Sequence, residues 1–125
     1  MSGKMSRDKG ARGEREAAKV LAEATGFPVD RSARIGKVGA ADLVGLPGFC
    51  IEVKYLYGTP VVNQWWKQAV RQADGETPLL MYRLRGHRVW TVRISARYFL
   101  PELPVESWVE MPVDTFGAII RMDTQ

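Results

Sequence analysis

Apolar positions recur along the chain with two spacings, one typical of helices and one typical of strands. In residues 11–25 the small and apolar positions return every three or four residues, and Gly26 follows as a natural helix end. A second helix is predicted over residues 60–74, with Thr59 as its N-cap and a proline at its first position. The polar residues 1–10 are expected to be flexible and frayed.

Shorter segments rich in apolar and β-branched residues are predicted to be strands, separated by turns such as Pro47-Gly48 and Arg85-Gly86-His87. These strands are expected at residues 27–32, 42–46, 49–55, 78–84 and 88–94. A helical turn is expected near 96–100, and the apolar run 116–120 is predicted to be a last strand. The order predicts an α/β (α+β) domain with a central mixed β-sheet flanked by helices.

The length of 125 residues favours a single domain over 1–125, with residues 101–125 as an acidic C-terminal extension. Cys50 is the only cysteine, which excludes an intrachain disulfide and zinc sites of four thiolates. It is expected to be a small packed residue of the strand. No stretch resembles a membrane span or a signal peptide, so we expect a cytoplasmic protein without a membrane partner.

The net charge of +4 conceals an uneven distribution. Residues 102–125 hold one basic and five acidic side chains, so the first 101 residues carry a net +8. Twelve of the 18 basic residues are arginine, which suits bidentate phosphate contacts. A polyanion such as DNA is the natural partner, and an unevenly charged solvated surface is the alternative.

Glu14 lies on the face of the first predicted helix that also carries Ala17, Ala18 and Leu21, whereas Glu16 points to the opposite side. A carboxylate on an inward face needs a metal ion or a cationic partner, because burying it unpaired costs several kcal/mol. The alternative is a glutamate near the helix start that remains in contact with solvent.

Strand alternation places Glu52 and Lys54 side by side on one face of the segment 49–55. If the strands 42–46 and 49–55 pair through their turn, Asp42 approaches that end of the hairpin. Two carboxylates and one ammonium would then converge, which suits Mg²⁺-dependent phosphodiester hydrolysis. The alternative is a simple ion pair on a solvated face.

The ordered set of motifs resembles the PD-(D/E)XK nuclease superfamily, and within it the archaeal-type and phage Holliday junction resolvases. The similar stretches are Lys9-Gly10-Ala11-Arg12-Gly13-Glu14-Arg15-Glu16, Val29-Asp30-Arg31-Ser32, Ala41-Asp42-Leu43-Val44 and Ile51-Glu52-Val53-Lys54. Gln64 and Pro78-Leu79-Leu80 follow in the expected order. Ala41 stands where the superfamily name has proline. The resemblance implies a restriction-endonuclease-like α-β-β-β-α-β core.

The resemblance also implies the roles of single residues. Asp42 and Glu52 would bind Mg²⁺, for which Mn²⁺ can substitute, with the Val53 carbonyl as a further ligand. Lys54 would act on the attacking water, and Glu14 would complete the site through a metal-bound water or through Lys54. Four more residues are implied near the substrate: Arg31 and Ser32 beside the scissile phosphate, Gln64 at the active site, and Gln68 behind it.

Other basic residues are candidates for contacts with the DNA backbone: Arg12, Arg34 and Lys37, the last two in a glycine-rich loop that could equally be an exposed loop. His87 is expected to contact phosphate or solvent rather than to act as a base. The apolar arc of the second helix, Trp65, Trp66, Ala69, Val70 and Ala73, is predicted to be core, with a dimer surface as the alternative.

The sequence therefore predicts a Mg²⁺-dependent endonuclease that cuts branched DNA as a homodimer. The alternatives are a nuclease for other DNA or RNA, and a nucleic-acid-binding module without catalysis.

Overall fold

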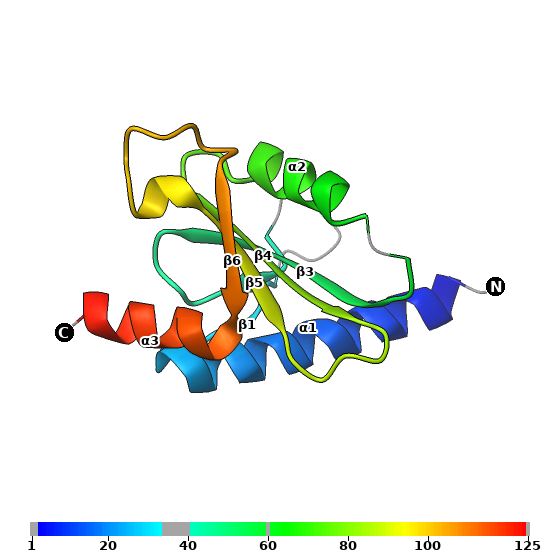
Figure 1. Ribbon diagram of the computed structural model, residues 1–125. Coiled ribbons are helices and arrows are strands. Elements are labelled where there is room, and N and C mark those ends of the chain that lie inside the picture. The colour runs from blue at the N-terminus through cyan, green and yellow to red at the C-terminus, as the bar shows by residue number, and fades with distance from the viewer. Residues whose placement is uncertain (1–2, 34–40, 60, 125) are drawn as a thin grey trace.

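A six-stranded mixed sheet forms the centre of the molecule, as the computed structural model shows for residues 3–33, 41–59 and 61–124 (Figure 1). The strands lie in sequence order across the sheet. Their bounds are β1 (Asp30–Arg31), β2 (Leu43–Val44), β3 (Phe49–Tyr57), β4 (Thr77–Leu84), β5 (Thr91–Ser95) and β6 (Trp108–Pro112). β3 and β4 are parallel and the other neighbours are antiparallel. The predicted fold class is confirmed, and the first six elements follow the implied α-β-β-β-α-β order.

Helices cover both faces of the sheet. Helices α1 (Gly3–Thr25) and α3 (Val113–Asp123) lie together on one face, and α2 (Val62–Gln72), which connects β3 to β4, lies on the other (Figure 1). The short helix η1 (Ala96–Tyr98) follows β5. In the described ranges, none of the helices combines the length and the apolar character that a membrane span requires.

The larger core cluster lies between the sheet and the pair α1 and α3. Leu21 from α1 and Phe116 from α3 meet the alternate buried residues of β3 to β5 there, such as Ile51. Glycine allows the helices to come close. A methyl group on Gly13 would overlap Tyr55 of β3, and one on Gly117 would overlap the backbone of Ala24. The helix that carries Glu14 is therefore pressed directly onto the strand that carries Glu52.

The smaller core cluster lies beneath α2. Trp65, Trp66 and Ala69 are buried there against Leu80 of β4. The core interpretation of this helical face is confirmed, so the two tryptophans are not available as a dimer surface. Cys50 is also buried, with its Sγ atom 3.6 Å from the Gln72 carbonyl at the end of α2. Burial and nearby carboxylates raise the pKa of its thiol to about 11, which favours the protonated form.

Several predicted boundaries were wrong. The first helix begins at Gly3, not near Ala11, so much of the segment expected to be frayed is helical. The run 116–120 lies within α3 rather than in a strand, because Val113, Phe116 and Ile120 form one buried helical stripe. Residue Val61, not Thr59, occupies the N-cap position of α2, and Pro60 lies outside the described residues.

Candidate active site

Asp42 is fixed at the start of β2 by the backbone of β3. Its N–H donates to the Ile51 carbonyl at 2.8 Å, and its Oδ2 atom accepts a hydrogen bond from the Val53 N–H at 2.8 Å. The predicted hairpin therefore forms and brings Asp42 to the Glu52 end of β3. Because the N–H and C=O of a strand residue point to the same side, the Val53 carbonyl also faces this edge.

Glu52 is the buried carboxyl group of the site, with only 4% of its surface exposed. Its Oε1 atom has no hydrogen-bond partner among the described residues. Its pKa is raised to about 8, chiefly by burial, then by the charge of Asp42 and by the hydrogen bond between the two carboxyl groups. The nearby charge of Lys54 acts in the opposite direction. Glu52 thus lacks enough positive charge around it to ionise easily.

Glu14 reaches the same cluster from α1. Its pKa is raised, first by burial and then by the charge of Asp42, while Arg31 opposes the shift. The Arg31 Nε atom donates to Glu14 Oε1 at 3.1 Å. A cationic partner, one of the options that the sequence left open, therefore exists. Arg31 was not identified as that partner from the sequence, because 17 residues separate the pair. The charge of Asp42 acts on both Glu14 and Glu52.

These groups suit a hard divalent cation. No set of three or more carboxylates, histidines or cysteines among the described residues is gathered closely enough to form a metal cage. Mg²⁺ does not need one, since it usually takes one or two carboxylates and completes its octahedron with water and substrate oxygens. Asp42, Glu52 and the Val53 carbonyl provide such a partial set. The unpartnered Glu52 oxygen is the observation that fits an ion, because a cation would satisfy it.

Ser32 and Arg31 both contact residues of the cluster. The Ser32 N–H donates to the Asp42 carbonyl at 2.9 Å, and Ser32 is buried. The remaining candidates are less closely connected with it. Gln64 is exposed in the first turn of α2, and no contact in the described ranges links it or the half-buried Gln68 to the carboxylates. Arg12 is exposed on α1. Arg34 and Lys37 lie outside the described residues.

Glu16 was predicted to point away from the protein, and that prediction was wrong. Its Oε2 atom accepts hydrogen bonds from Arg83 Nη1 at 2.6 Å and from Trp90 Nε1 at 2.8 Å. The partners lie 67 and 74 residues away in the chain, so the helical pattern alone gave no signal for them.

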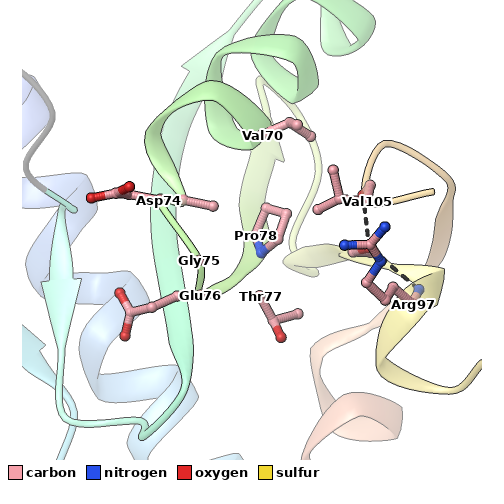
Figure 2. A pocket seen from close by; sticks show the side chains of 10 residues that line it. Val70, Asp74, Gly75, Glu76, Thr77, Pro78, Arg97 and Val105 are labelled. Atoms are coloured by element: carbon pink, nitrogen blue, oxygen red, sulfur yellow. Dashed lines mark hydrogen bonds between the residues drawn. The ribbon is translucent and has the colours of Figure 1, made fainter. Parts of the chain in front are cut away.

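A separate cavity of about 230 Å³ lies where β4 begins, at the C-terminal end of α2 (Figure 2). Asp74, Glu76 and Arg97 supply its charged lining. The buried Ser95 hydroxyl in its wall already donates to the Val105 carbonyl at 2.7 Å. This cavity contains none of the carboxylates described above and is not part of the candidate active site.

The fold and the carboxylate cluster at the sheet edge define a nuclease-like protein. A family model described as "Phage putative PDDEXK endonuclease" matches residues 5–99, and the chain belongs to this family. Among solved structures, the chain is similar to Archaeoglobus fulgidus Hjc, a Holliday junction resolvase from an archaeal hyperthermophile. The sequence identity is 23%, the TM-score is 0.51, and the match covers 86% of this chain and 88% of that one. This likeness shows the shared fold. No curated protein matches the chain.

Proposed function

We propose that the protein is a Mg²⁺-dependent endonuclease that hydrolyses phosphodiester bonds in branched DNA. The observation that carries the proposal is the convergence of Asp42, buried Glu52 and Lys54 at one edge of the sheet, with one carboxylate oxygen left unpartnered. The family match supports endonuclease chemistry. The net +8 over the first 101 residues supports a polyanionic substrate.

Asp42 and Glu52 hold the ion in this proposal, with the Val53 carbonyl beside them. When bound, Mg²⁺ stabilises charge on the phosphate and activates a water nucleophile. As an ammonium, Lys54 orients that water and offsets the charge of the phosphate; as a neutral amine, it instead takes the proton of the water. Arg31 holds Glu14 in place and lies near enough to the cluster to contact a phosphate oxygen.

The preference for branched DNA is the finer part of the proposal. Hjc, which shares the fold, is a Holliday junction resolvase. A homodimer would present two such sites to two strands of a four-way junction. Sedimentation of the purified protein, alone and with a junction, measures this stoichiometry.

Cleavage of a panel of labelled DNAs tests the function. We expect the wild-type protein with Mg²⁺ or Mn²⁺ to cut a four-way junction faster than linear duplex, flaps or single strands. The variants Asp42→Asn, Glu52→Gln and Lys54→Ala should each lose on the order of a thousandfold in rate while still binding the junction. Arg71→Gln, at the far end of α2, is the control and should cut normally.

The outcomes separate the alternatives. If the junction is cut no better than linear duplex, resolvase specificity is contradicted. The protein would then be an endonuclease that acts on another DNA structure. Cleavage of RNA instead of DNA would redefine the substrate. Binding with no metal-dependent cleavage by pure wild-type protein would show a nucleic-acid-binding module.

A further inference from the structure

The turn between β4 and β5 is an exposed basic feature outside the carboxylate site. Arg85, Gly86, His87 and Arg88 form this segment, called the basic turn below, and all four are exposed. The His87 N–H donates to the Leu84 carbonyl at 3.0 Å, and Gly86 takes a positive φ of 86°. The turn therefore has a definite closed conformation and presents two arginines.

The basic turn is fastened to α1 through Arg83. The Arg83 Nε atom donates to the His87 carbonyl at 2.6 Å, and its Nη1 atom donates to Glu16 Oε2 at 2.6 Å. Trp90, just beyond the turn, donates to the same glutamate oxygen and stacks on Tyr55 with the ring centroids 5.8 Å apart. The turn is thus held from both of its ends.

The acidic side chain nearest the basic turn is already paired within the protein. Glu16 is paired with Arg83, whereas no ion pair joins Arg85 or Arg88 to an acidic side chain of the described residues. Two further arginines are exposed on α1 near Glu16. Arg12 lies one helical turn before it, and Arg15 directly precedes it. Figure 1 shows the connection from β4 to β5 beside this half of α1. The surface is therefore positively charged and unneutralised.

The position of the basic turn follows from the strand register. Glu52 is level with Leu80, and Leu84, which precedes the turn, lies four residues further along β4. At about 3.3 Å per strand residue, the turn begins about 13 Å from the level of Glu52. Duplex DNA rises about 3.4 Å per base pair, so a duplex lying along the strand direction would cover this separation in about four base pairs.

We propose that the basic turn binds backbone phosphates of a duplex arm of the substrate, about four base pairs from the scissile phosphate. The inference rests on the proposed function and adds a second contact region to it. Arg85 and Arg88 provide the phosphate contacts, since arginine suits bidentate phosphate binding. Glu16 and Arg83 are positioning residues that fix the turn relative to the site.

Binding to a junction in EDTA, followed across a salt series, tests the phosphate contacts. The double variant Arg85→Gln and Arg88→Gln should bind on the order of tenfold more weakly, and the slope of log K against log[salt] should decrease in magnitude by about 2. The matched control is Arg71→Gln with Arg97→Gln. It removes the same charge at the opposite end of β4 and should bind within about twofold of wild type. Melting curves verify that both proteins fold.

Shortening one arm of the DNA tests the distance. Wild type should lose affinity when the duplex ends within about four base pairs of the cleaved bond, and the Arg85/Arg88 variant should not respond to this truncation. The proposal is overturned if the variant loses no more affinity than the control, or if it responds to truncation as wild type does. Either result with intact wild-type cleavage leaves the proposed function standing, whereas a wild type that neither binds nor cuts DNA removes both.

Discussion

Two charged clusters within the molecule differ in how completely they are paired. Around the buried Arg93 of β5, Glu110 accepts from Nε at 2.8 Å and Asn63 accepts from Nη1 at 3.1 Å. The guanidinium lies 3.6 Å from the ring centre of Trp108, and Tyr82 donates to the same Glu110 oxygen. At the Asp42 edge, by contrast, Glu52 is more deeply buried than any of its counterions and keeps an unpartnered oxygen.

The difference separates a network whose charges are balanced from one whose charges are not. The Arg93 cluster is balanced by acceptors and an aromatic ring, so it stabilises the fold as it is. The carboxylate cluster carries repulsion among Glu14, Asp42 and Glu52 that the protein alone does not offset. Perturbed carboxyl groups of this kind are typical of functional sites. The contrast predicts opposite responses to mutation in the two places.

Removing the cation from the balanced cluster should have the largest effect on stability. Arg93→Met leaves Glu110 and Asn63 without their partner and removes the contact with Trp108. The free energy of unfolding should therefore decrease by about 3 kcal/mol. Urea denaturation measures this change. The exposed Arg97→Met is the control and should change stability by less than about 0.5 kcal/mol. Equal effects of the two substitutions would show that the Arg93 network is not structural.

Neutralising the unbalanced cluster should instead stabilise the metal-free protein. The folded-state pKa of Glu52 is about 8, above the ordinary 4.5, so the folded state binds a proton between these values that the unfolded state has lost. Wild-type stability in EDTA should therefore fall as pH rises through this window. The Glu52→Gln variant has no carboxyl group to ionise there, so it does not lose this stability. It should be more stable than wild type by about 1–3 kcal/mol at pH 9, with little difference at pH 4.5. A stability difference that is the same at both pH values would contradict this account.

Mg²⁺ should provide the missing charge and give the smallest of the three effects. At ten times its dissociation constant the ion should stabilise wild type by about 1.4 kcal/mol, seen as a higher melting temperature. The double variant Asp42→Asn and Glu52→Gln should not respond. A NaCl series of matched ionic strength distinguishes binding from screening, and an equal shift in both proteins would argue against a site at these carboxylates.

Local patterns predicted the part of the site that depends on one hairpin. Alternation along β3 and the Pro47-Gly48 turn are short-range signals, and they placed Asp42 correctly beside the Glu52 end of the strand. The partners of Glu14 and Glu16 were missed because they come from β1, from β4 and from the residue before β5, and no spacing along α1 encodes them. The run 116–120 was misassigned because a short apolar run fits a strand or a helix equally well.

Helix α3 has a consequence for the order in which the molecule can be completed. The Arg121 Nε and Nη2 atoms donate to the Ala24 and Glu23 carbonyls at the end of α1, at 2.9 and 3.0 Å. Residue 121 lies beyond the family-matched span 5–99, yet it closes the helix that carries Glu14. During synthesis on the ribosome, α1 emerges long before Arg121 is available to make these hydrogen bonds. The helix that presents Glu14 therefore gains its final support only after nearly a hundred further residues have been made.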